Sequence, residues 1–195
     1  DGEQQLAMMD TRNELVFFNP RTGEHEVIYP DVEMTGLDVQ ALESDPSGEK
    51  LYLSGYQGSI AIYDTKKQAF TLQERDPHQI EGFGFLNNKV YMGAYGGARI
   101  YEYDPKKDYL FTRNNEMNNP KLIYSVPTQQ SRPFTFASGD NHLFTGTISD
   151  YGKLGGSFAA YDAKRKEWSS IENIIENQSI IGLAYKKGKV YGGSA

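Results

Sequence analysis

Residues 89–106 read KVYMGAYGGARIYEYDPK, and this stretch contains two elements that recur along the chain. The first is a short apolar run, Val90-Tyr91-Met92-Gly93, and copies of it begin at residues 51, 90, 143 and 190, with a degenerate copy at residue 6. The second is a strand-like run ending in an aromatic residue and then Asp or Asn. Its copies end at Phe18-Asn19, Tyr63-Asp64, Tyr103-Asp104 and Tyr161-Asp162. The copies of the first element begin 39, 53 and 47 residues apart, and a repeat spacing of about this size is typical of repeat architectures.

Each copy of the second element leads into a predicted turn. Asp or Asn at the first turn position can accept hydrogen bonds from the backbone that follows, and Pro20 and Pro105 supply a suitable φ angle. We therefore interpret Asn19, Asp64, Asp104 and Asp162 as structural residues of hairpins rather than catalytic carboxylates.

Two further strands complete each unit, which we label a, b, c and d in unit order. The b and c strands are the two elements above. The d strands are predicted at residues 24–29, 69–73, 109–112 and 167–171, and the a strands at 38–42, 80–86, 134–137 and 179–185. The chain then reads bcd, abcd, abcd, abcd, ab.

Four antiparallel strands in a unit of about 40 to 50 residues predict an all-β fold, a β-propeller with four-stranded blades. The units run over about 6–36, 37–79, 80–133, 134–178 and 179–195, within a single domain of residues 1–195. The c strands are apolar on both faces, as expected for blades packed between two others. Closing these units into four blades would duplicate strand b, so we expect about four blades' worth of a six- to eight-bladed ring.

Composition narrows the function classes. The 195 residues include 14 Tyr, 10 Phe and 20 Gly, which suits strands joined by tight turns. A net charge of -6 argues against nucleic-acid binding, and no apolar run is long enough to span a bilayer. The absence of Cys removes disulfides, cysteine-ligated zinc and thiol catalysis.

The second half of the chain resembles a known group of proteins. The stretches that carry the likeness are residues 90–105, 132–134, 151–156 and 178–185. They resemble bacterial β-propeller repeat proteins with WD-type or YVTN-type blades, found in secreted or surface proteins associated with carbohydrate. The resemblance implies a binding role and an extracellular or cell-surface location, with a cytoplasmic one left open.

Loop lengths predict a functional face. In an abcd blade the b–c and d–a connections share one face, and the two longest connections, 113–133 and 147–156, are expected there. Long connections are often functional. Within them Tyr124, Arg132, Tyr151 and Lys153 could recognise an anionic or sugar ligand by stacking and charged hydrogen bonds.

The mouth of the central channel is a second candidate region. Polar residues that precede or begin the a strands are expected to approach it, and they are Asp38, His78, Gln79, Arg132 and Gln178. Of the three histidines, His25 is interpreted as a packing residue of a d strand and His142 lies on the opposite face, so only His78 is placed for chemistry. No spacing predicts a metal site or a cofactor.

Three function hypotheses follow. The first is a non-catalytic binding propeller that engages a glycan or a protein partner with its long-loop face. The second is a propeller enzyme, a polysaccharide lyase or lactonase-type hydrolase, with Arg132, His78 and a tyrosine at the channel mouth. The third is a purely structural segment. The lack of a catalytic constellation makes us favour binding over catalysis.

Overall fold

The computed structural model describes residues 4–10, 12, 14–30, 38–74, 78–112 and 114–195. These residues form 17 strands and no helix. Every strand pair is antiparallel. The all-β prediction is therefore confirmed.

The strands form five sheets that follow one another along the chain. The first sheet has three strands: β1 (Leu6–Met9), β2 (Leu15–Phe18) and β3 (His25–Ile28). The second has four: β4 (Val39–Ser44), β5 (Lys50–Gly55), β6 (Ile60–Asp64) and β7 (Ala69–Glu74). The third is β8 (Ile80–Leu86), β9 (Lys89–Ala94), β10 (Arg99–Tyr103) and β11 (Lys121–Ser125). The fourth is β12 (Gln130–Gly139), β13 (His142–Ser149), β14 (Ser157–Asp162) and β15 (Glu167–Glu172), and the fifth is β16 (Ile180–Lys186) with β17 (Lys189–Ser194).

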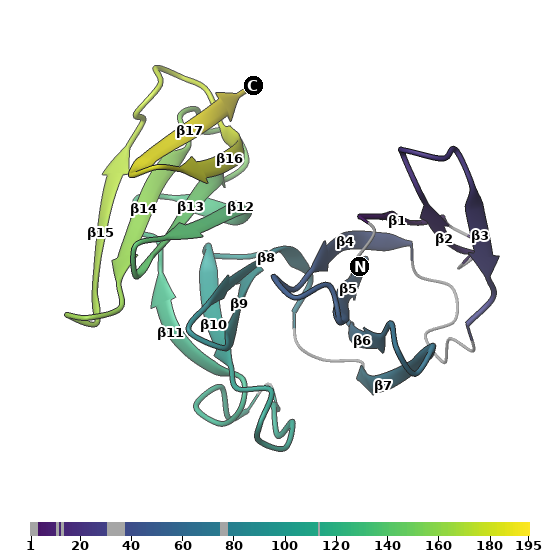
Figure 1. Ribbon diagram of the computed structural model, residues 1–195. Coiled ribbons are helices and arrows are strands. Elements are labelled where there is room, and N and C mark those ends of the chain that lie inside the picture. Colours follow the sequence, from purple (N-terminus) through teal and green to yellow (C-terminus); the bar gives the residue numbers. More distant parts are fainter. Residues whose placement is uncertain (1–3, 11, 13, 31–37, 75–77, 113) are drawn as a thin grey trace.

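The sheets are arranged as blades around an open arc (Figure 1). The a strands β4, β8, β12 and β16 lie on the inner side and pack against one another, and the d strands lie on the outer side (Figure 1). Neighbouring strands in each sheet are consecutive in the sequence. The predicted strand order along the chain, bcd, abcd, abcd, abcd, ab, is therefore confirmed.

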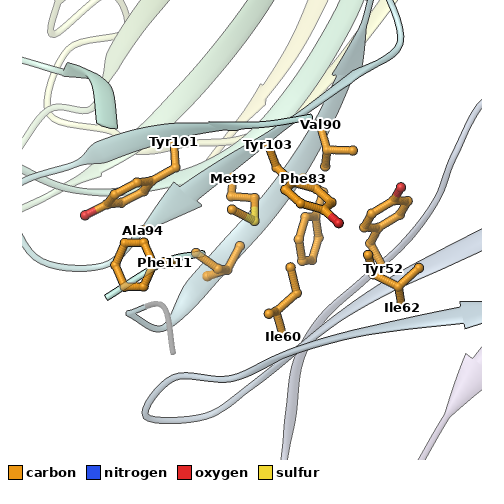
Figure 2. Packing of buried hydrophobic residues seen from close by; sticks show 11 residues of the cluster. Tyr52, Ile60, Ile62, Phe83, Val90, Met92, Ala94, Tyr101, Tyr103 and Phe111 are labelled. Carbon is orange, nitrogen blue, oxygen red and sulfur yellow. The ribbon is translucent and has the colours of Figure 1, made fainter. Parts of the chain in front are cut away.

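Hydrophobic side chains fill the spaces between neighbouring blades. Tyr52, Ile60 and Ile62 of the second blade face Phe83 and Met92 of the third (Figure 2). Comparable clusters lie on two further interfaces, around Leu53 and Tyr63 between the first and second blades and around Tyr91 and Leu143 between the third and fourth. Because the second, third and fourth blades are covered on both faces, their central strands carry apolar side chains in both directions.

Two glycines let the third and fourth blades approach closely. Gly82 and Gly93 are paired across β8 and β9, and a Cβ atom on Gly93 would lie 2.3 Å from the carbonyl oxygen of Pro133. A Cβ atom on Gly82 would lie 2.6 Å from the carbonyl oxygen of Phe134. The inner strand β12 therefore packs directly on the backbone of the preceding blade.

The predicted turn residues act as expected. The carboxylate of Asp64 accepts hydrogen bonds from the backbone nitrogens of Lys66 and Lys67, at 3.0 and 2.9 Å. Asn19, Asp104 and Asp162 accept equivalent bonds in their own turns. These residues stabilise hairpins.

One predicted strand is wrong. Residues 109–112 do not pair with β10; the d strand of the third blade is β11, Lys121–Ser125. Residues 104–112 and 114–120 instead belong to a long connection in which Phe111 is buried against Tyr101. Alternate burial of Tyr109 and Phe111 imitates the pattern of a strand, which is why the sequence misleads here.

This changes the predicted loops. Residues 113–133 are not one connection, because β11 and the start of β12 lie within them, and the d–a connection is only 126–129. The b–c connection is 150–156, and the long connection, 104–120, joins strands c and d. β12 also begins earlier than predicted. It accommodates Pro133 because it is the edge strand of its sheet and the ladder is irregular there.

Candidate functional site at the channel mouth

A β-bulge recurs near the start of every inner strand. The strand ladder skips one residue at Gln40, Glu81, Ser131 and Ile181. A bulge bends the strand and changes the direction of its side chains. Gln40 and Glu81 are themselves bulge residues and Arg132 directly follows one, and the side chains of these three residues, from three successive blades, are hydrogen-bonded to one another through Glu81.

Glu81 is the centre of this group. Its side chain is only 1% exposed, and its carboxylate accepts hydrogen bonds from three side chains. Gln40 Nε2 donates to Oε2 at 2.9 Å, while Gln79 Nε2 and Arg132 Nε donate to Oε1 at 2.8 and 3.2 Å. A buried carboxylate needs such donors, and here they come from blades on both sides.

Arg132 lies close to two tyrosine rings. Its Cζ atom is 4.6 Å from the ring centroid of Tyr95 and 5.4 Å from that of Tyr151. Its Nη2 donates a hydrogen bond to the Tyr151 hydroxyl at 3.0 Å. The guanidinium is thus held by a carboxylate on one side and by two cation–π contacts, which fixes its orientation.

The charges of this group act on one another. The hydrogen bond from Arg132 holds the pKa of Tyr151 below its ordinary value. The contact with Tyr151 raises the pKa of Tyr95. Burial lowers the pKa of Arg132, but its hydrogen bond with Tyr151 and the charge of Glu81 outweigh that effect and raise it.

A tyrosine occurs in the turn between strands b and c of three successive blades. Tyr56 and Tyr95 directly follow their b strands, and Tyr151 lies in the same turn of the next blade. The backbone nitrogens of Tyr56 and Tyr95 each donate to the residue before the inner strand of their blade, Asp38 and Gln79, at 2.8 Å. Tyr56 and Tyr151 are 50% and 73% exposed. We call Tyr56, Tyr95, Arg132 and Tyr151 the mouth cluster.

A second polar cluster lies beside the first. His78 Nε2 is 3.0 Å from Glu116 Oε1, and Arg99 Nη1 donates to the same oxygen at 3.2 Å. Burial raises the pKa of Glu116, but the hydrogen bond with His78 and the charge of Arg99 outweigh it, so the pKa is lowered. Arg99 also donates to the carbonyl of Gly96, in the turn that carries Tyr95. This cluster joins the 104–120 connection to the turn of the mouth cluster.

The structure brings only some of the predicted site residues together. Gln79, Arg132 and Tyr151 share one hydrogen-bonded network through Glu81. His78 belongs to the neighbouring cluster.

The other predicted site residues lie apart from that network. Tyr124 is on the outer strand β11, stacked on Trp168 at 4.6 Å between ring centroids, in the packing between blades. Lys153 is exposed in the 150–156 turn. The backbone carbonyls of Asp38 and Gln178 accept hydrogen bonds from the backbone nitrogens of Tyr56 and Gly156.

The predicted alignment of the mouth residues is partly wrong. Asp38 and Gln79 are equivalent, because the backbone carbonyl of each accepts a hydrogen bond from the turn after strand b. In the next two blades the carbonyls that accept this bond belong to Gln129 and Ser179, and the donors are the backbone nitrogens of Asp150 and Ala195. His25, expected to pack within its blade, is exposed.

Sequence reasoning missed Glu81, Gln40, Tyr56 and Tyr95. A signal for the tyrosines was present, because Gly55-Tyr56-Gln57-Gly58 and Ala94-Tyr95-Gly96-Gly97 occupy matching places after strand b. No local signal marked Glu81 as an acceptor shared between blades, since its donors on the neighbouring blades, Gln40 and Arg132, lie 41 and 51 residues away.

Within the described ranges, no three His, Cys, Asp or Glu side chains gather in a way that could hold a metal ion. The same part of the chain contains no helix of the length and apolarity that crossing a membrane requires.

Comparison with solved structures identifies the architecture. Over 94% of its length the chain superposes on the β-propeller domain of Cps50 (Swd1) from Myceliophteria thermophila, with a TM-score of 0.63 and 11% identity. The chain has a β-propeller fold. It is also similar to hydrazine synthase from Kuenenia stuttgartiensis, over 91% of its length, with a TM-score of 0.59 and 13% identity.

This propeller chain spans 59% of the Cps50 domain and 50% of the hydrazine synthase chain. It matches no protein-family model and no curated protein sequence. At these identities the likeness concerns the fold alone, so function has to be argued from the site.

Proposed function

We propose that this propeller is a non-catalytic interaction module that binds a protein partner at the mouth cluster. The observation that carries the proposal is the position of Arg132, held on buried Glu81 and flanked by Tyr95 and Tyr151. Its side chain is 24% exposed, and Nη1 has no hydrogen-bond partner among the described residues. A guanidinium fixed in this way can donate to a ligand with little loss of side-chain entropy.

The composition of the cluster supports a polypeptide partner. Tyr and Arg are enriched among the residues that contribute most to protein–protein binding. The exposed rings of Tyr56 and Tyr151 supply contact area, and the fixed guanidinium of Arg132 supplies directional hydrogen-bond donors. Glu81 already balances the charge of Arg132, so the cluster has no strong preference for an anionic ligand.

The enzyme hypothesis has less support. Glu81 is engaged by three donors, and His78 is held against Glu116 and Arg99 in the other cluster. Neither group is presented as a free base beside Arg132, which proton transfer to a substrate would require.

Parallel peptide and glycan arrays test the proposal, each probed with labelled wild-type protein, Arg132→Ala and Tyr151→Ala. We expect peptides whose signal falls at least about tenfold in both variants, the loss typical of a dominant contact. Lys106→Ala, on the exposed turn of the opposite face, is the control and should leave the signal unchanged.

Three results would contradict the proposal. Peptide binding that is unaffected by both variants would place the site elsewhere on the propeller. Binding of glycans alone, sensitive to both variants, would keep the face and reject a protein partner. If neither array gave a signal dependent on Arg132 or Tyr151, the interaction role of this face would be rejected. Thermal unfolding of each variant shows whether it remains folded.

A further inference from the structure

A cleft lies between the second and third blades, at the opposite ends of the strands from the mouth cluster. Its volume is about 630 Å³, within the range of sites that hold small molecules. Residues of the a–b turns of both blades line it, and so do Pro105 and Lys106 of the third blade. Because strand b begins at the a–b turn and ends at the b–c turn, this cleft and the mouth cluster lie on different faces.

Apolar side chains from the core line part of the cleft. Tyr52 and Val90 are buried members of the core between the two blades, and Phe85 packs against that core. The rings of Tyr52 and Phe85 are inclined at 58°, with centroids 5.3 Å apart. Aromatic rings prefer such inclined contacts, so the ring of a ligand can pack against this pair and be withdrawn from water.

The hydroxyl of Tyr52 has no hydrogen-bond partner among the described residues, although the residue is only 3% exposed. A comparison with Tyr91, at the same place in the third blade, explains why. Tyr91 donates to its cross-strand neighbour Glu102 at 3.3 Å. The cross-strand neighbour of Tyr52 is Ile62, whose side chain has no acceptor.

The hydroxyl of Tyr52 is open to the cleft. The unpaired hydroxyls of Tyr63 and Tyr101 are enclosed in the core, but that of Tyr52 is not enclosed, and the residue lines the cleft. Burial raises the pKa of Tyr52 above its ordinary value, so the hydroxyl keeps its proton at neutral pH. It can donate to a ligand or accept from one, and a ligand that pairs with it offsets the cost of a poorly solvated polar group.

The charged side chains that line the cleft do not favour a charged ligand. Three of the five are in ion pairs with groups outside the lining: Lys50 with Asp64, Lys89 with Asp104, and Glu49 with Lys66. The other two, Asp45 and Lys106, have opposite signs and belong to different blades. An ion entering the cleft would leave water without gaining an unopposed counterion, and a neutral molecule avoids that cost.

We propose that this cleft binds a small neutral aromatic molecule that carries one hydroxyl or carbonyl oxygen. The oxygen is hydrogen-bonded to the hydroxyl of Tyr52, and the ring packs against Tyr52, Phe85 and Val90. This site is independent of the proposed function, because it lies on the other face of the propeller and takes a different class of ligand.

Ligand-observed NMR titration of the 195-residue protein with three probes of similar size tests this inference. The probes are p-cresol, which has a hydroxyl, toluene, which has no oxygen, and p-toluate, which is an anion at neutral pH. We expect p-cresol to bind about tenfold more tightly than toluene, the effect of one hydrogen bond to an otherwise unpaired hydroxyl. The anion p-toluate should bind at least about tenfold more weakly than p-cresol, because it loses hydration without gaining a counterion.

A change of one functional group connects binding to the hydroxyl. Tyr52→Phe keeps the ring and should lower the affinity for p-cresol about tenfold, to that for toluene, while the affinity for toluene stays within about twofold of wild type. Tyr91→Phe is the matched control, because its hydroxyl is bonded to Glu102 and its side chain packs in another interface. It should leave the affinities of all three probes unchanged. Thermal unfolding of both variants shows whether they remain folded.

Several results would overturn the inference. It is rejected if p-cresol binds no more tightly than toluene, if p-toluate binds most tightly, or if Tyr52→Phe leaves the affinity for p-cresol unchanged. An equal loss of affinity for p-cresol and toluene in Tyr52→Phe would also reject it, because the hydroxyl would then not be the contact. If none of the probes binds, the cleft is not a site for this class of molecule. None of these results depends on Arg132, so the peptide array and this titration can succeed or fail separately.

Discussion

At the scale of single residues, one buried carboxylate organises the candidate site. Glu81 is nearly inaccessible and accepts hydrogen bonds from blades on both sides. A buried ion pair contributes little by itself relative to a well-packed apolar pair, but removal of one partner leaves a charge without its counterion. The same contact therefore positions Arg132 and makes the fold depend on it.

We expect Arg132→Ala to lower the free energy of unfolding by about 1–3 kcal/mol. The loss is smaller than for a fully buried pair, because Arg132 is 24% exposed. Urea denaturation measures it. Adding Glu81→Gln to Arg132→Ala should recover part of the loss, because the uncompensated charge is then gone. A change below about 0.5 kcal/mol in the single variant, typical of ordinary surface positions, would contradict the role of the pair.

At the scale of elements, the hairpins repeat one device with small variations. The last residue of β6, Asp64, accepts from the turn backbone and pairs with Lys50, while Asn19 at the matching place in the first blade accepts the backbone bonds with a neutral amide. In the third blade Asp104 pairs with Lys89 in the same way. The backbone bonds need only an acceptor, so the charge is an additional contribution in the second and third blades.

This difference predicts a dependence on pH. The hydrogen bond from Lys50 holds the pKa of Asp64 at about 2, below its ordinary 3.8. A carboxyl with a lowered folded-state pKa stabilises the fold above its unfolded-state pKa, and the contribution is lost as pH falls through the folded-state value. We expect stability to decrease between about pH 4 and about pH 2, and Asp64→Asn to remove part of that decrease.

Thermal unfolding of wild type and Asp64→Asn across this interval is the measurement. Lys67→Ala serves as control, since Lys67 contributes only its backbone nitrogen to the carboxylate of Asp64. Parallel pH profiles for wild type and Asp64→Asn would show that the Lys50–Asp64 pair does not contribute.

At the scale of the whole molecule, the blades are held together by close approach of inner strands to glycines. Gly82 and Gly93 are covered by β12, and a Cβ atom on Gly146 would lie 2.4 Å from Ile180 of the next sheet. Gly182 and Gly193 form the equivalent pair of β16 and β17, and a Cβ atom on either would meet nothing within 4 Å. The third and fifth sheets thus carry a glycine pair at equivalent positions, but a following inner strand covers the pair only in the third sheet.

These two pairs give a matched comparison. Gly93→Ala should lower the free energy of unfolding by about 1–3 kcal/mol, because the new methyl group collides with the Pro133 carbonyl and the blades must separate. Gly193→Ala should change it by less than about 0.5 kcal/mol. Guanidinium denaturation of both variants is the measurement, and equal effects would contradict the close packing of β12 on β9.

The candidate site shows where sequence reasoning is sufficient and where it is not. Arg132, Gln79 and Tyr151 were found because they are polar or aromatic residues near predicted strand ends. Glu81 was not, because it lies inside an apolar strand and its importance comes from a bulge. The sequence predicts Tyr124 in a loop, but residues 121–125 form a strand, and Tyr124 stacks on Trp168.

By itself, the sequence determined the repeated strands, their order and the hairpin turns, since these depend on side-chain alternation and on Asp or Asn beside the turn backbone, all local properties. The tertiary structure alone decided which of two alternating segments, 109–112 or 121–125, becomes the fourth strand of the third blade. It also decided that Gln40, Glu81 and Arg132 meet at the mouth. Both outcomes depend on packing between blades, whose contacts join residues about 40 to 50 positions apart and leave no pattern in any short stretch of sequence.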